Sequence, residues 1–250
     1  MEVRDASGAV VRTFEAPVTL GVNRIAWDLR RNPFRRPPSE GEGSFFRGGG
    51  VEVLPGTYTV KVSYGGAEAT QSVRVLADPR FDVAQGAREA NQEALLAAGA
   101  LQERLSKAIE RIHDLQGDVG RVQAKVRAER KAAHDEALDQ EVMDAARDLT
   151  KGLSDLEAKL WVPEGSEGIP PETTPWDKVS NVLRSIRSSW DAPNTAQREY
   201  LARATKAVDD ATAEADRFFA EKVPAFKAAM DEAGLGLLAA PREGGKPGAK

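Results

Sequence analysis

The clearest local signal lies at residues 57–75, which read TYTVKVSYGGAEATQSVRV. Apolar and polar side chains alternate from Tyr58 to Tyr64, as in a strand with one face in a core. Gly65-Gly66 follows, and both residues tolerate the positive φ angles of a two-residue turn. A return strand is expected over Ala67–Val75. This stretch therefore predicts an antiparallel β-hairpin.

Further short strands are expected on the N-terminal side of this hairpin. Val3–Asp5 and Val10–Arg12 flank the turn-forming Ala6-Ser7-Gly8. Asn23–Leu29 predicts another strand, with Trp27 pointing into the core. Several short antiparallel strands at this spacing predict a small β-sandwich over residues 1–79.

The hydrophobic period changes after Asp78-Pro79, where helical spacing begins. Asp82 and Gln85 resemble a capping box that opens a helix over about 82–131. Its apolar seam recurs every three or four residues. The seam comprises Leu101, Leu105, Ile109, Ile112, Leu115, Val119, Val122 and Val126. A second seam, expected over 135–160, comprises Leu138, Val142, Ala145, Leu149, Leu153, Leu156 and Leu160.

Two more helices are expected after a Pro/Gly-rich loop. Thr174-Pro175 predicts the start of a helix over 175–190, because a hydroxyl cap precedes a first-turn proline. Asn194 caps a last helix over 194–232, which Pro224 kinks or restarts. Residues 236–250 are predicted to be disordered. The fold class is therefore α+β with two domains, a β-sandwich over 1–79 and an antiparallel, elongated four-helix bundle over 80–235.

Composition excludes many kinds of chemistry. The 250 residues contain no cysteine and only two histidines, His113 and His134, so thiol chemistry and a three-histidine metal site are excluded. No phosphate-binding glycine motif is present. A net charge of −4 argues against nucleic-acid binding, and no apolar run is long enough to span a bilayer. We expect no cofactor, no metal and no catalytic residue.

One candidate binding site combines arginines with aromatic residues in the loop 30–47. Its members are Arg30, Arg31, Phe34, Arg35, Arg36, Phe45, Phe46 and Arg47. Guanidinium groups beside aromatic rings suit phosphates, acidic glycans or an acidic protein surface. In the simpler interpretation, the phenylalanines pack on the helices and the arginines pair with the acidic helical region. That region, residues 81–250, carries 24 basic and 30 acidic side chains.

Other candidate sites are weaker. Glu110 and His113 have the spacing of di-iron ligands in a bundle, but Lys131 occupies the equivalent position before His134. We therefore expect His113 to be structural or exposed. Glycoside hydrolysis needs two carboxylates across a sugar site, and no such pair stands out. Three tryptophans are expected to pack at a bundle end rather than form a sugar platform, namely Trp161, Trp176 and Trp190.

The β region resembles the immunoglobulin-like module of the flagellar hook-capping type. The residues that carry the resemblance are Asp5-Ala-Ser-Gly8, Val10–Thr13, Gly21–Asp28 with its G-x-N-x-x-x-W-D pattern, and Pro55–Val60 with its P-G-x-Y pattern. The resemblance implies that the sandwich is immunoglobulin-like.

The whole chain is similar to the C-terminal region of large bacterial proteins with an N-terminal sortilin-type propeller of BNR-like repeats. Such proteins are often labelled glycosyl hydrolases or photosystem stability/assembly-factor-like. The matching elements are Asp78-Pro79-Arg80 and Pro193-Asn-Thr195 with Gln197. The 250 residues contain no propeller repeats, and Met1–Asp5 has no apolar signal core, so no signal peptide is expected within these residues.

This resemblance implies a non-catalytic region that supports or presents the propeller of an exported, extracytoplasmic protein. Its partners would be that propeller or another protein. Two alternatives stay open: a glycosyl hydrolase-like enzyme with its activity in the missing propeller, and a module that binds an anionic glycan or partner through loop 30–47.

Overall fold

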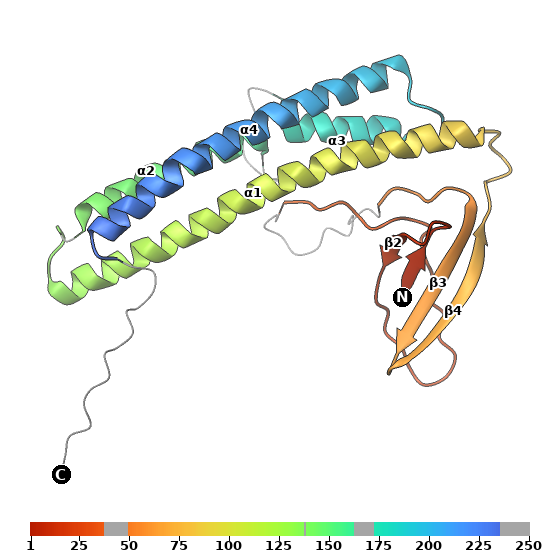
Figure 1. Cartoon of the computed structure of the whole chain (residues 1–250), viewed down its shortest axis with the longest axis horizontal. Coiled ribbons are helices and arrows are strands. Elements are labelled where there is room, and N and C mark those ends of the chain that lie inside the picture. The colour runs from red at the N-terminus through yellow and green to blue at the C-terminus, as the bar shows by residue number, and fades with distance from the viewer. Residues whose placement is uncertain (38–49, 138, 163–172, 236–250) are drawn as a thin grey trace, which may run out of the picture. The chain divides into compact units, whose positions relative to one another are not determined.

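The fold is described from a computed structural model (Figure 1), which describes residues 1–37, 50–137, 139–162 and 173–235. It is α+β: a four-stranded antiparallel open sheet precedes four packed helices. The chain forms two compact units. The first unit contains residues 1–107 and 161–209, and the second contains 108–160 and 210–250. The predicted domain boundary at Asp78-Pro79 stays a prediction.

The sheet consists of four strands in the order β2-β1-β3-β4, and every neighbouring pair is antiparallel. The strands are β1 (Glu2–Arg4), β2 (Val10–Thr13), β3 (Gly56–Tyr64) and β4 (Ala67–Val75). Between β1 and β2, the Asp5 carboxylate accepts hydrogen bonds from the Ser7 and Ala9 N–H groups. Gly8 has a φ of +83° in this turn, which glycine adopts without steric cost. Both predicted hairpins are confirmed.

The predicted sandwich is wrong, because the sheet is open and the described residues form no second sheet over it. Asn23–Leu29 is not a strand. The Asn23 side chain donates a hydrogen bond to the Thr19 carbonyl and so closes a local turn instead. Leu29 has a φ of +57°, which interrupts an extended strand. The only pairing of this region is an isolated bridge between Arg30 and Glu52 among the described residues.

A small apolar core lies against the sheet, where irregular segments take the place of a second sheet. It consists of Val3, Val11, Val53, Tyr58 and Val75, flanked by Phe14, Trp27 and Val60. Trp27 meets Tyr58 edge to face, with ring centroids 5.5 Å apart. The Tyr58 hydroxyl donates to the Leu54 carbonyl at 2.7 Å. Trp27 therefore fills the core as expected, although it comes from a loop.

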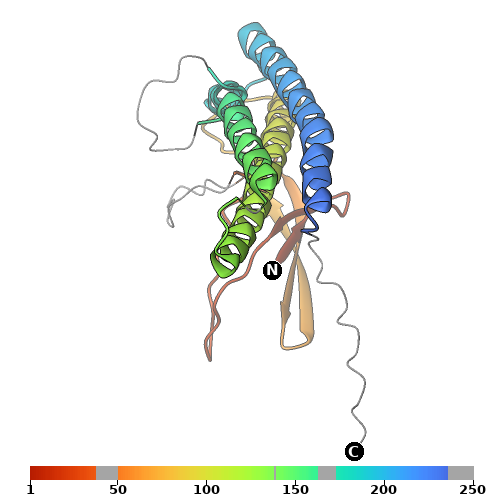
Figure 2. The ribbon, with the colours of Figure 1, turned by 90° about the vertical axis from the view of Figure 1, so that its left-hand side faces the viewer.

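The outer half of the β3–β4 hairpin has no such cover. Along the same face of β3, Tyr58 is 7% exposed but Val62 is 40% and Tyr64 71% exposed. In β4, every residue except Val75 is exposed. Figure 2 shows the two strands as a long ribbon. The predicted apolar row is thus a core row only at its inner end.

The four helices are α1 (Gln85–Ala133), α2 (Gln140–Leu160), α3 (Pro175–Ile186) and α4 (Thr195–Glu232). All four predicted helices are present, with shifted ends. Because α1 begins at Gln85, Asp82 does not cap it. Arg88 donates to the carbonyls of Val83 and Phe81, which holds the preceding segment outside the helix.

The predicted seams form the helical core. In α1 every seam residue is buried except the half-buried Leu115, and in α2 every described one is buried except the half-buried Ala145. Leu138 lies outside the described residues. Thr174 caps α3 in a reciprocal capping box with Asp177, and Asn194 and Gln197 exchange equivalent bonds at α4. Pro224 lies inside α4 without ending it.

Candidate functional site

The predicted binding loop is described only up to Pro37. That part contains Arg30, Arg31, Phe34, Arg35 and Arg36. The other members lie outside the described residues, namely Phe45, Phe46 and Arg47. The described backbone is attached to its surroundings, because the Arg31 N–H donates to the Val51 carbonyl and the Asn32 N–H donates to the Val11 carbonyl, each at 2.8 Å.

This segment is also bound to the first part of α1. The Phe34 ring lies directly over Gly99, where any Cβ would overlap it. The Arg35 carbonyl accepts from Gln102 Nε2 at 2.8 Å and from Ser106 Oγ at 3.0 Å. Both polar side chains are buried, so their hydrogen-bonding capacity is used by the loop. Phe34 thus packs on a helix, as the simpler interpretation expects.

A cavity of about 670 Å³ lies in the first unit. It is lined by parts of the segments 28–30, 50–55, 75–83, 88–95 and 187–191. Of the predicted loop residues that the structure describes, Arg30 alone lines it. Asn91 fixes one wall, because its Nδ2 lies 2.9 to 3.3 Å from the carbonyls of Ile186, Ser189 and Asp191.

One side of the cavity is aromatic. Phe81 and Trp190 meet edge to face, with centroids 5.0 Å apart. The guanidinium of Arg88, which is almost fully buried, lies 5.1 Å from the Trp190 ring centroid. A cation over a ring face is attracted by the ring quadrupole. Trp190 therefore shapes this wall beside the first turn of α1.

Two carboxylates at the cavity already have partners. Glu52 accepts from Arg30 at 3.0 Å and from the Trp190 indole N–H at 2.9 Å. Asp78 accepts a forked bond from Arg80, and this bond lowers the pKa of Asp78 from 3.8 to about 2. A general acid needs a raised pKa, so Asp78 is unsuited to donate a proton.

Unlike these two carboxylates, the Arg187 guanidinium has no direct partner among the described residues. Arg187 follows the last residue of α3 and lines the same cavity. Its guanidinium makes no hydrogen bond or ion pair with any part of the chain that the structure describes. Burial, with the nearby charges of Arg30 and Arg36, lowers the pKa of Arg187. The Glu52 carboxylate opposes this shift, and the carboxyl end of a helix also favours a cation there.

A tight turn exposes apolar side chains elsewhere in the first unit. Asn23 Oδ1 accepts from the Thr19 N–H, and Asn23 Nδ2 donates to the carbonyls of Thr19 and Gly21. Gly21 has a φ of +107°. Leu20 and Val22 are fully exposed at this turn, at 106% and 101% of their reference areas. We call residues 18–23 the apolar turn.

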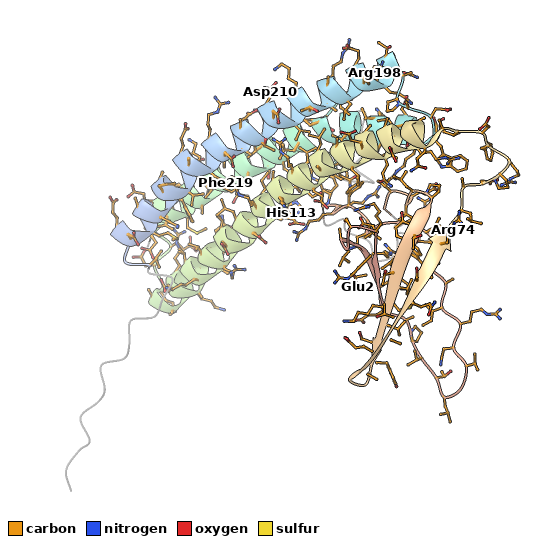
Figure 3. All side chains as sticks on the ribbon, turned by 45° about the vertical axis from the view of Figure 1, so that its right-hand side comes forward. Glu2, Arg74, His113, Arg198, Asp210 and Phe219 are labelled. Carbon is orange, nitrogen blue, oxygen red and sulfur yellow. The ribbon has the colours of Figure 1, made fainter. Side chains whose placement is uncertain are left out.

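His113 belongs to the second unit (Figure 3). Its Nε2 lies 2.7 Å from Glu157 Oε1, and Gln116 Nε2 reaches the other oxygen of that carboxylate at 3.5 Å. This contact joins α1 to α2. In the same unit, Arg111 bonds Asp216 at 2.7 Å and lies 4.4 Å from the Phe219 ring centroid. These contacts are those of a helix interface.

The described residues provide few candidate ligands for a metal ion or a sugar. Among the described residues, no group of three or more His, Asp and Glu side chains could hold a metal ion. Trp161 and Trp176 pack on one another edge to face at 6.2 Å. No helix in the described ranges combines the length and apolar character needed to cross a membrane.

Several site residues escape prediction from the sequence, namely Arg88, Asn91, Gln102, Ser106 and Arg187. Gln102 and Ser106 each follow a seam leucine directly, so a polar interruption beside the seam is a usable signal for a buried loop anchor. Arg187 carries no such signal, because its neighbour Arg30 is distant in the sequence.

Comparison with known proteins found no matching family model, no matching curated protein and no matching solved structure. The resemblance to hook-capping-type modules and propeller proteins therefore stays a prediction.

Proposed function

We propose that this chain is a non-catalytic interaction region that supports or presents an N-terminal propeller in a larger exported bacterial protein. An immunoglobulin-like ancestry of the β region and an antiparallel, elongated arrangement of the helices are part of this proposal. The apolar turn is the observation that carries it.

The apolar turn suits docking into a protein pocket. Its conformation is fixed by the Asn23 side chain before any partner arrives, so little conformational entropy is lost on binding. Leu20 and Val22 have no cover, and burying such a side chain is worth about 1.5–3 kcal/mol. The two aliphatic side chains of this rigid turn could therefore bind an apolar pocket of a partner protein by hydrophobic burial alone.

The coding sequence upstream of Met1 gives the first test. In-frame propeller repeats would support the proposal, and a stop codon directly upstream would refute it. The propeller so found is then expressed separately and titrated with this chain in a calorimeter.

We expect the double variant Leu20→Ser/Val22→Ser to weaken that binding by about 2 kcal/mol or more. Tyr200→Ser is the matched control, because Tyr200 is an exposed apolar residue on α4. Equal affinity of the double variant and the wild type would contradict a role for the apolar turn.

A second candidate function is binding of an anionic ligand, as the third sequence interpretation expects. The observation that favours it is the unpaired Arg187 guanidinium beside Arg30 in the cavity. A sulfated oligosaccharide is the probe. Binding should weaken with added salt and with Arg187→Ala, whereas Arg184→Ala in the last turn of α3 should leave it unchanged. The glycosyl hydrolase alternative also stays a prediction.

A further inference from the structure

Strand β4 forms an open edge of the sheet. It pairs with β3 in unbroken register over nine residues, from Ala67 opposite Tyr64 to Val75 opposite Gly56. Its other side has no strand neighbour in the described chain. Long edges are usually protected by a proline, a bulge, charged side chains or a covering segment. β4 has no proline and no bulge, and all its residues but Val75 are exposed.

The hydrogen-bonding groups on this edge can be identified from the hairpin. Gly65-Gly66 is a two-residue turn, so Tyr64 and Ala67 beside it form a hydrogen-bonded pair. Backbone groups of successive residues in an antiparallel strand point alternately to either side. The open edge is therefore formed by the N–H and C=O groups of Glu68, Thr70, Ser72 and Arg74.

The side chains along this edge are complementary to themselves. In an antiparallel pair of two β4 strands with Gln71 opposite Gln71, Glu68 of each copy lies opposite Arg74 of the other. Thr70 then lies opposite Ser72 on the same face. A shift by two residues in either direction removes both charge pairs. One register alone therefore satisfies both charges.

Both charged side chains are available for this pairing. Glu68 uses Oε1 for Lys61 at 2.8 Å and for Ser63 at 3.2 Å, which leaves Oε2 without a partner in the described chain. Arg74 (Figure 3) likewise makes no side-chain hydrogen bond or ion pair with the described residues. Opposite charges directly across two strands stabilise the pair.

The opposite face of the sheet adds an apolar contribution. Ala69 would lie opposite Val73 of the second copy, next to the exposed Val62 and Tyr64 of β3. The turn end of each hairpin would lie beside the Val75 end of the other. The open edge, its complementary charges and the apolar face all favour the same pairing. We infer that β4 docks antiparallel on β4 of a second copy of this chain, so that the two sheets form one continuous sheet of eight strands.

Sedimentation equilibrium of the full chain tests this inference. The wild-type mass should rise with concentration toward twice that of one chain. Arg74→Glu and Glu68→Lys each place like charges opposite one another twice, so each should weaken the dimer about tenfold or more. In an equimolar mixture, the two variants should form a heterodimer, because both opposed pairs are then of opposite charge. Arg184→Glu is the control for charge reversal away from β4.

A backbone variant gives an independent readout. Ser72→Pro removes an N–H that faces the open edge and not β3, so the chain should fold and remain monomeric. Circular dichroism checks the fold. The inference is overturned if the wild type is a monomer up to about 1 mM, if Ser72→Pro dimerises like the wild type, or if mixing the two charge variants restores nothing.

Discussion

The apolar rows of α2 and β3 have equally regular spacing but differ in burial. In α2, the row from Val142 to Leu160 is buried at both ends, and only Ala145 within it is half-buried. In β3, Tyr58 is buried and Tyr64 is open to solvent. Helices of the second unit accompany α2 over its length, whereas the described irregular segments, with Phe14, Trp27 and Val53, cover the inner end of the sheet. Periodicity thus determines the direction of a side chain, and the length of the covering segment determines its burial.

The largest expected effect comes from shortening one apolar side chain in each of the two rows. Leu153→Ala removes a fully buried side chain and should lower the free energy of unfolding by about 3 kcal/mol. Val62→Ala should lower it by less than about 0.5 kcal/mol. Urea denaturation followed by circular dichroism measures both. Similar losses in both variants would mean that the outer half of the hairpin is covered in solution.

The contact between Phe34 and Gly99 gives the next effect, because it joins a loop to a helix. Gly99→Ala gains about 1 kcal/mol of helix propensity but displaces the Phe34 ring. We expect a net loss of about 1–2 kcal/mol. In the background of Phe34→Ala, the same change should stabilise the chain. A double-mutant cycle measures this reversal, and additive effects would contradict the contact.

The two tyrosines at opposite ends of the β3 row allow a smaller comparison. Tyr58→Phe removes the hydrogen bond to the Leu54 carbonyl and should cost about 1 kcal/mol. Tyr64→Phe removes a hydroxyl that is already in water and should cost nothing measurable. Thermal unfolding of the two variants in parallel separates these outcomes. An equal cost at both positions would remove the distinction between the two ends.

The smallest expected effect is electrostatic and lies between the two regions. The forked bond from Arg80 holds the pKa of Asp78 at about 2, below its ordinary 3.8. Because this pKa is lowered, the contribution of the pair to stability is complete above pH 3.8 and is lost as the pH falls through about 2. A carboxyl titration by NMR should show this value. Arg80→Ala should return the pKa toward 3.8, and an unchanged value would exclude the pair.

Much of the architecture follows from local patterns in the sequence. Both hairpins are predicted because their turn residues, Gly8 and Gly65-Gly66, have a conformational reason to be there. The helices are predicted because their seams extend over many turns, and Thr174 shows that even a cap can be read from a few residues.

The failures have a common physical origin. Asn23–Leu29 alternates like a strand, yet the Asn23 side chain bonds its own turn and Leu29 leaves the extended region. Neither event is visible in the alternation. The cavity could not be predicted for a similar reason. Arg30 and Arg187 line it together because α3 packs beside Asn91, and this contact joins segments that are far apart in the sequence. Hydrogen bonds of individual side chains and contacts between distant segments thus determine the irregular segment and the cavity, and hydrophobic periodicity predicts neither.

The three carbonyls bound by Asn91 also constrain the order of assembly during synthesis. They belong to residues 95 to 100 positions later in the chain. The first unit requires residues 161–209, so it cannot be completed while the ribosome is still adding α2. Closing such distant contacts is slow and leaves apolar surface open in the meantime. The nascent chain therefore carries an incomplete first unit through the synthesis of much of the second.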